Sequence, residues 1–155
     1  MRGILLDTGI LVDYLRYKRS SRPKDKRQAF LSHQAAKLIE GAIEEKIPLF
    51  ISVHTWKELI QYPNISEQEE RRILADIPVF CKIVNTTKNI AKVAALLSRA
   101  SPEFRKHHVE DCYIAAVAIV RQLPLYTTNP KDFNYVKNEK LKRKLKIVQP
   151  YQYVE

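Results

Sequence analysis

The sequence predicts a three-layer α/β/α domain, in which helices cover both faces of a central sheet of four to five mostly parallel strands. Short apolar runs alternate along the chain with longer segments of helical periodicity. This alternation is typical of strand–helix–strand units, which build parallel sheets. The chain of 155 residues contains no internal repeat and no low-complexity segment. We therefore expect a single domain over residues 1–155.

The first half of the chain provides two of the expected strands. An apolar run opens the sequence and ends abruptly at Asp7. Pro23 lies in a basic, polar stretch and indicates a mobile loop, whereas Pro48 directly precedes the second apolar run. The expected elements are a strand at 2–6, a helix at 8–17, a loop at 18–27, a helix at 28–46 and a strand at 49–52.

The second half continues this alternation. Pro63 ends the helix after the second strand, and Ser66 with Glu69 predicts a capping box at the start of the next helix. Asn129 and Pro130 indicate a turn after the fourth strand. The expected elements are a helix from 52 or 55 to 62, a helix at 65–75, a strand at 79–84, a helix from 86 or 87, an irregular connection at 101–108, an apolar helix at 111–120, and strands at 124–127 and 146–148.

The net charge of +10 indicates a polyanionic partner, with nucleic acid as the leading class. Many of the cations fall into two clusters. One cluster alone would be explained by a solvated surface, but two clusters favour binding to a phosphate backbone. The clusters are Arg16, Lys18, Arg19, Arg22, Lys24, Lys26 and Arg27, and Lys137, Lys140, Lys142, Arg143, Lys144 and Lys146.

Other features exclude several classes of protein. No apolar run approaches the roughly 20 residues of a transmembrane helix. The N-terminus lacks the pattern of a signal peptide, so we expect a cytoplasmic protein with no membrane association. Cys81 and Cys112 have no metal-ligand spacing and lie in apolar contexts, which predicts reduced core residues. We interpret the adjacent His107 and His108 as loop residues that face RNA or phosphate, and not as zinc ligands.

Four carboxylates follow strands or open helices: Asp7, Glu58, Asp111 and Asp132. Each has a purely structural alternative, because Asp7 and Asp111 could be helix N-caps, Glu58 could close a capping box with Thr55, and Asp132 could be a turn residue. A parallel sheet, however, gathers such junctions at one edge. Carboxylates gathered there repel one another unless a cation neutralises them, and oxygen ligands suit Mg²⁺ or Mn²⁺. An acidic cleft in a basic protein therefore indicates a metal site for a phosphodiester.

These residues resemble the PIN-domain ribonucleases, and most closely the VapC-type toxins of toxin–antitoxin pairs. The resemblance covers nearly the whole chain. Two positions depart from the family pattern: Gly9, where many members have Asn or Ser, and Asn129, where some members have a metal-site Asp. The matching segments are residues 5–15, 51–52 with 56–59, 111–118, 123–133 and 147–150.

The resemblance implies a metal-dependent endoribonuclease that leaves a 5′-phosphate and a 3′-hydroxyl. Asp7 and Asp111 would be direct Mg²⁺ or Mn²⁺ ligands, and Glu58 would bind the metal directly or through water. Either Asp132 or Asn129 would complete the site. Thr8, Thr127 or Asn129 would hydrogen-bond to a carboxylate or a phosphate. The residues expected to contact RNA are Arg16, Lys18, Arg19, Arg22, His107, His108 and Lys131.

The resemblance further implies a homodimer and a small antitoxin that wraps the apolar surface and shields the site. The main alternative is a non-catalytic module with the same fold that binds RNA or a protein partner. Loss of two or more of the acids would favour that alternative, but all four are present. A phosphatase that uses Asp7 as its nucleophile would need a second Asp two residues later, where this chain has Gly9.

Overall fold

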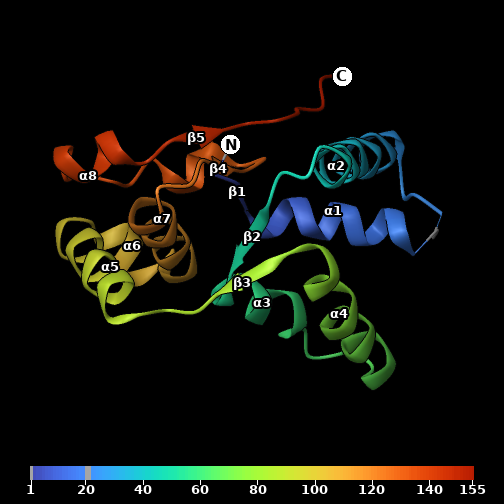
Figure 1. The fold of residues 1–155 in the computed structure, drawn as a ribbon, viewed down its shortest axis with the longest axis horizontal. Coiled ribbons are helices and arrows are strands. Elements are labelled where there is room, and N and C mark those ends of the chain that lie inside the picture. The colour runs from blue at the N-terminus through green and yellow to red at the C-terminus, as the bar shows by residue number, and fades with distance from the viewer. Residues whose placement is uncertain (1, 20–21) are drawn as a thin grey trace.

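Five parallel strands form the centre of the structure, and helices cover both faces of their sheet (Figure 1). This computed structural model describes residues 2–19 and 22–155. The elements are β1 (Ile4–Leu6), α1 (Thr8–Lys18), α2 (Lys26–Glu44), β2 (Leu49–Ser52), α3 (Val53–Ile60), α4 (Glu67–Phe80), β3 (Lys82–Val84), α5 (Lys88–Ala100), α6 (Pro102–Lys106), α7 (Val109–Arg121), β4 (Leu125–Tyr126), the 3₁₀ segment η1 (Pro130–Phe133), α8 (Glu139–Lys144) and β5 (Ile147–Val148).

The strand order is β3-β2-β1-β4-β5, so the first strand lies in the middle of the sheet. All four pairings are parallel, and β1 pairs with β2 through Ile4 opposite Leu49 and with β4 through Leu5 opposite Leu125. The predicted sheet is confirmed. Because every strand runs in the same direction, the segments that follow β1, β2 and β4 all leave from one edge.

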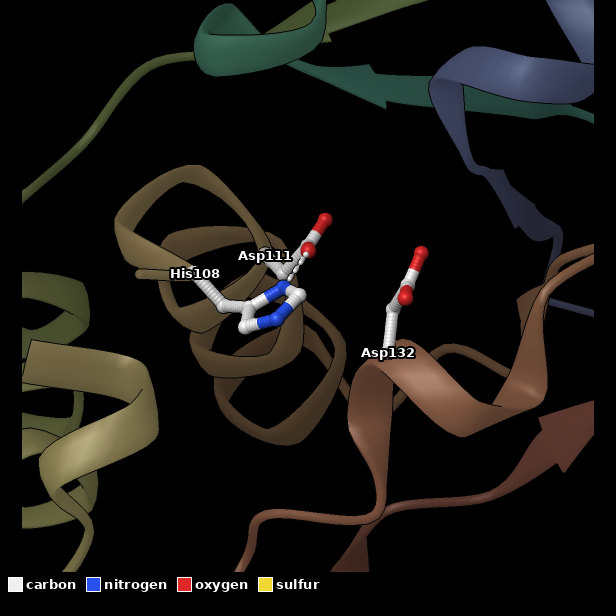
Figure 2. Close-up of side chains that lie close together, drawn as sticks. All are labelled: His108, Asp111 and Asp132. Carbon is white, nitrogen blue, oxygen red and sulfur yellow. Dashed lines mark hydrogen bonds and ion pairs between the residues drawn. The ribbon is translucent and has the colours of Figure 1, made fainter. Parts of the chain in front are cut away.

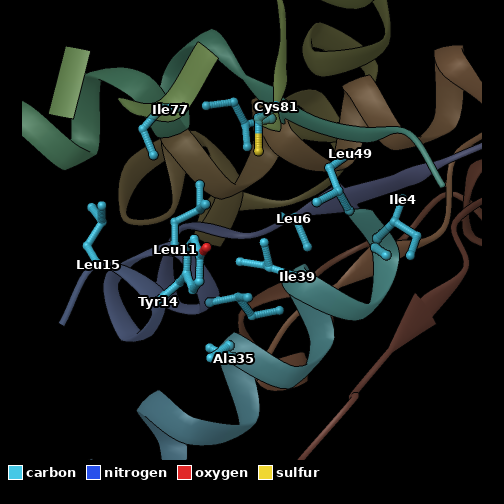
Figure 3. Packing of buried hydrophobic residues seen from close by; sticks show 14 of the residues in the cluster. Ile4, Leu6, Leu11, Tyr14, Leu15, Ala35, Ile39, Leu49, Ile77 and Cys81 are labelled. Carbon is cyan, nitrogen blue, oxygen red and sulfur yellow. The ribbon is translucent and has the colours of Figure 1, made fainter. Parts of the chain in front are cut away.

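Successive residues of β1 point to opposite faces of the sheet, and each face has its own core. Ile4 and Leu6 pack on one face against residues of α1, α2 and α4, as Figure 3 shows. Leu5 packs on the other face against residues of α5, α6 and α7. Residues 112–119 of α7 are almost wholly buried there, which explains the apolar, alanine-rich character of that helix. The predicted three layers are confirmed.

Helix α4 begins as expected but runs further than expected. The Ser66 hydroxyl accepts a hydrogen bond from the backbone N–H of Glu69, as the capping signature predicts. The helix then continues through Pro78 to Phe80, so the strand expected at 79–84 is reduced to β3. Burial explains the extension, because Ile77 is fully buried and the Phe80 ring packs edge-on against Tyr14 at 5.2 Å between centroids.

Two short helices lie outside the expected pattern. The connection expected to be irregular, 101–108, contains α6, in which the Ser101 hydroxyl caps the helix and Phe104 is fully buried. Helix α8 was not expected, and its single buried side chain is Leu141. Helices this short carry too few apolar residues to show a period, so tertiary burial of one side chain decides them.

The basic loop expected at 18–27 is shorter than predicted, because α1 includes Lys18 and α2 begins at Lys26. Residues 20 and 21 of that segment lie outside the described residues. Cys81 and Cys112 are buried free thiols, in agreement with the sequence. None of the described helices combines the length and the apolar character that crossing a membrane requires.

Candidate active site

Asp7 lies where β1 ends and α1 begins, near the middle of the sheet edge. Its side chain is 6% exposed and accepts two hydrogen bonds, from the Thr8 backbone N–H at 2.8 Å and from the Thr127 hydroxyl at 2.7 Å. Asp7 is therefore the N-cap of α1, as one interpretation held. Its second oxygen is nevertheless bound across the sheet, so capping does not account for the whole side chain.

Burial raises the pKa of Asp7 to about 6. The hydrogen bonds from Thr127 and Thr8 lower this pKa, whereas the negative charges of Asp111 and Glu58 raise it further. These opposing effects show that the carboxylates on three different elements lie within electrostatic reach of one another.

Glu58 lies on α3, directly after β2. The interpretation of Glu58 as part of a capping box with Thr55 is wrong, because the N-cap of α3 is Ser52, whose hydroxyl accepts from the His54 N–H. Instead, Glu58 accepts a hydrogen bond from the Thr8 hydroxyl at 2.6 Å. Burial raises the pKa of Glu58, and the charges of Asp111 and Glu110 add to that effect.

Asp111, Asp132 and His108 form the other side of the site. Figure 2 shows Asp111 on α7 and Asp132 on η1 with their carboxylates projecting in the same direction. The His108 Nδ1 atom lies 2.9 Å from Asp111 Oδ2, and one potential ligand atom from each of the three residues lies within 4.8 Å of the others. The N-cap position of α7 is His108, so the N-cap interpretation of Asp111 is wrong. This cluster could bind a divalent cation.

The pKa of Asp111 is raised, chiefly by burial. The hydrogen bond from His108 lowers it, and the charge of Asp132 raises it. The fold thus brings the four carboxylates to one edge of the sheet, where Asp7 follows β1 and the other three lie on α3, α7 and η1. Their set of oxygen atoms, supplemented by one imidazole nitrogen, matches the ligands that divalent cations prefer.

The expected supporting residues divide into two kinds. Thr8 donates to Glu58 and Thr127 donates to Asp7. Asn129 is exposed and reaches the site through its backbone N–H, which donates to the Thr127 hydroxyl at 3.0 Å. Its side chain forms no hydrogen bond within the described part of the chain. Asp132 therefore belongs to the cluster with His108 and Asp111, whereas the Asn129 side chain does not. The role of either residue in the site stays a prediction.

Glu110 is a further charged residue beside the site, and the sequence alone did not indicate it. Glu110 bridges α7 to α3 through its two oxygens, with His54 Nδ1 at 3.3 Å and Lys57 Nζ at 3.5 Å. The oxygen near Lys57 is buried and has no hydrogen-bond partner among the described residues, so its charge is balanced there by the ion pair. The His54 ring also stacks on Tyr113 at 4.1 Å. The only local signal was the position of Glu110 before Asp111, which did not distinguish it from a helix-start residue.

The basic residues expected to contact RNA lie in different surroundings. Arg16 and Lys131 line one groove together with Thr8. Arg19 instead forms an ion pair with Glu69, and Lys18 lies over the Tyr14 ring. Arg22 and His107 are exposed, whereas His108 turns toward Asp111.

Comparison with known proteins agrees with this architecture. Residues 4–139 match the family model of the PIN domain. Ribonuclease VapC1 of Methanocaldococcus jannaschii is 30% identical over 139 residues, which cover 90% of this chain and 85% of that protein. A toxin–antitoxin complex from Klebsiella pneumoniae has a similar chain, with 26% identity, a TM-score of 0.60 and coverage of 97% of this chain and 100% of that chain. FitAcB from Neisseria gonorrhoeae shares the fold at 19% identity, with a TM-score of 0.65 and coverage of 95% and 97%.

Proposed function

This chain belongs to the PIN domain family, and from that premise we propose that it is a VapC-type, divalent-metal-dependent endoribonuclease and the toxin of a toxin–antitoxin pair. The observation that carries the proposal is the convergence of Asp7, Glu58, Asp111 and Asp132 at one sheet edge of a chain with net charge +10. Such a site suits a metal ion that would lie between the carboxylates and a phosphodiester, while the basic surface binds the rest of the RNA.

Each carboxylate has a distinct role in this proposal. Asp7 and Asp111 would hold Mg²⁺ or Mn²⁺ directly, and Glu58 would hold it directly or through water. When bound, the cation supplies a water of lowered pKa for in-line attack and neutralises charge on the phosphate. Asp132 completes the site or orients the attacking water by accepting its hydrogen bond. The products are expected to be a 5′-phosphate and a 3′-hydroxyl.

The threonines hold the carboxylates in place for this chemistry. The Thr127 hydroxyl fixes one Asp7 oxygen and the Thr8 hydroxyl fixes one Glu58 oxygen, without adding a charge. Cation binding requires the deprotonated carboxylates. Because the metal-free Asp7 has a pKa of about 6, we expect metal affinity, and with it cleavage, to fall as the pH drops through 6.

A small antitoxin is the expected protein partner, as in the Klebsiella pneumoniae complex. A groove between α1, α3 and α4 has a mixed lining, in which Leu15, Leu59 and Ile73 are buried and Arg16, Arg19 and Glu69 are charged, so the expectation of an antitoxin rests on the resemblance and not on this groove. The homodimer and the cytoplasmic location stay predictions.

The test is incubation of the pure protein with a labelled structured RNA in Mg²⁺, in Mn²⁺ and in EDTA. We expect metal-dependent cleavage by the wild type and none by Asp7→Asn or Asp111→Asn. Asp76→Asn is the matched control, since that carboxylate lies on α4 and has no ion pair or hydrogen bond among the described residues.

The other outcomes separate the alternatives. RNA that is bound but left uncut under every metal would favour the non-catalytic binding module. Cleavage that survives in both site variants would contradict the placement of the site.

A further inference from the structure

Two of the helices that carry acids of the site are joined by a contact between His54 and Glu110. The His54 Nδ1 atom of α3 lies 3.3 Å from Glu110 Oε1 of α7, and Lys57 Nζ lies 3.5 Å from the other Glu110 oxygen. Helix α3 also carries Glu58, and Glu110 directly precedes Asp111 on α7. We propose that this contact, the α3–α7 bridge, holds Glu58 and Asp111 at the separation that a bound divalent cation requires, an inference that rests on the proposed ribonuclease function.

The imidazole of His54 is held in a single orientation. Its Nε2 atom lies 3.0 Å from the hydroxyl of Thr86, which follows β3, and its ring stacks on Tyr113 with 4.1 Å between centroids and 8° between planes. A neutral imidazole satisfies both nitrogen contacts, because Nδ1–H can donate to Glu110 while Nε2 accepts from Thr86. The fixed ring of His54 therefore determines where the Glu110 carboxylate lies.

The first turn of α7 depends on such tertiary contacts. Asp7 and Ser52 cap α1 and α3 with their side chains, whereas the N-cap of α7, His108, forms no side-chain hydrogen bond to the first turn in the described part of the chain. A helix without a side-chain cap leaves its first N–H groups unsatisfied and is less stable at that end. Glu110 and Asp111 both lie in this turn, so the bridge to α3 also restrains Asp111.

The same bridge opposes the repulsion between the two helices. His54 and Glu58 are four residues apart on α3, so they lie on one face of that helix. This face is turned to α7, since His54 contacts Glu110 and Tyr113. The negative charges of Asp111 and Glu110 both raise the pKa of Glu58, so these carboxylates repel one another across the two helices. Without the bridge, we expect the first turn of α7 to move away from α3.

Two simpler explanations of Glu110 make different predictions. Its negative charge alone would attract a cation, or its contact with His54 would stabilise the fold without affecting the site. His54→Phe distinguishes these explanations, because it preserves the stacking on Tyr113 and the charge of Glu110 but removes both nitrogen contacts.

The experiment titrates Mn²⁺ into the full chain and measures free Mn²⁺ by its electron paramagnetic resonance signal. We expect His54→Phe to bind Mn²⁺ about tenfold more weakly, as is usual when a partner that orients metal ligands is lost. His54→Gln should recover most of the affinity, because its amide can donate to Glu110. Glu110→Gln should weaken binding less than His54→Phe does, because its carbonyl oxygen still accepts from His54. His33→Phe on α2 is the matched control and should leave the affinity unchanged.

A second measurement follows the first turn of α7 without any metal. The Cys112 N–H donates to the His108 carbonyl at 2.9 Å, and this hydrogen bond opens the helical ladder. Hydrogen exchange of the Cys112 amide in EDTA should be several-fold faster in His54→Phe than in the wild type, and close to the wild type in His54→Gln. Thermal unfolding verifies that each variant is folded at the temperature of the measurement.

Two results would overturn the inference. If His54→Phe binds Mn²⁺ as tightly as the wild type does, the bridge has only a structural role. If Glu110→Gln binds Mn²⁺ as weakly as His54→Phe does, or more weakly, Glu110 acts through its charge and not by positioning.

The same variants separate this inference from the proposed function. If the wild type neither binds Mn²⁺ nor cleaves RNA, the ribonuclease proposal fails, and faster Cys112 exchange in His54→Phe would still show that the bridge holds α7 in place. If the wild type cleaves RNA and His54→Phe does so with the same dependence on Mn²⁺ concentration, the bridge has no positioning role and the ribonuclease proposal stands.

Discussion

The acidic site has two halves that hold their carboxylates by different means. In the half around the buried Asp7, which we call the buried half, Asp7 and the half-buried Glu58 each accept a hydrogen bond from a threonine hydroxyl. In the open half, Asp111 contacts His108, and these two side chains are 20% and 27% exposed. A hydroxyl fixes the position of a carboxylate but leaves its charge intact, whereas a histidine can also carry the opposite charge.

This difference indicates how the metal-free protein tolerates four gathered acids. In the buried half, burial raises the pKa of Asp7 to about 6, so a proton can take the place of a cation once the pH falls below that value. The open half relies on solvent and on His108. Substitutions that act on one half at a time therefore test whether the two halves differ in this way.

The largest effect is expected from Asp7→Asn, which should abolish cleavage and yet stabilise the metal-free fold at neutral pH. The pKa of Asp7 rises from 3.8 to about 6 on folding, so its charge costs up to about 3 kcal/mol above pH 6. The folded state binds more protons between these values, so the stability gain should shrink as the pH falls from 6 and vanish near 4. Thermal unfolding in EDTA across this range measures it.

Asp132→Asn is the counterpart in the open half. Asp132 is only partly buried, so the same loss of charge should change the unfolding free energy by no more than about 0.5 kcal/mol. Equal stabilisation by both variants would show that the two halves do not differ in the way proposed.

The next effect is expected from Thr127→Val, which removes the donor to Asp7 while preserving the shape of the side chain. Thr127 lowers the pKa of Asp7, so its loss should raise that pKa and shift the pH midpoint of Mn²⁺ binding upward. Affinity at neutral pH should fall about 10–100-fold, the usual cost of losing a ligand-orienting partner. Mn²⁺ titrations at several pH values measure both, and an unchanged midpoint would contradict the role assigned to Thr127.

A smaller effect is expected from His108→Gln in the open half. His108 lowers the pKa of Asp111 through its hydrogen bond, so the variant should bind Mg²⁺ several-fold more weakly, at most about tenfold. Ni²⁺ binding should fall further if the imidazole is itself a ligand, because Ni²⁺ prefers nitrogen more than Mg²⁺ does. His107→Gln, which changes the exposed neighbour, should leave both affinities unaltered.

The smallest effect is expected from Gly9→Ala, at the start of α1. A Cβ atom at Gly9 would lie 3.2 Å from the Thr128 hydroxyl, whereas one at Gly41 of α2 would have nothing within 4 Å. Gly41→Ala should therefore gain the usual helix preference of alanine, about 0.5–1 kcal/mol in unfolding free energy. Gly9→Ala should gain less unfolding free energy. An equal gain, measured by denaturant unfolding, would show that the Thr128 side chain moves away from the new Cβ atom at no cost.

The sequence by itself determined the layers, the parallel sheet and the edge at which the acids gather. Periodicity separates strands from long helices, and parallel strands leave their following segments at a common edge, so Asp7 and Glu58 could be placed near each other without coordinates. The structure rejects two alternatives, a capping box of Thr55 with Glu58 and an N-cap at Asp111. Both fail because the helix begins one turn earlier, with Ser52 as the N-cap of α3 and His108 as the N-cap of α7.

Only the tertiary structure decided which partner each acid has and which cations adjoin the site. The hydrogen bond from Thr127 to Asp7 spans 120 positions and depends on β4 pairing with β1. The packing of α4 against α1 likewise pairs Arg19 with Glu69, whereas Arg16 forms no ion pair among the described residues. Such contacts join elements far apart in sequence and leave no local pattern, because they follow from the strand order and from the packing of helices on the sheet.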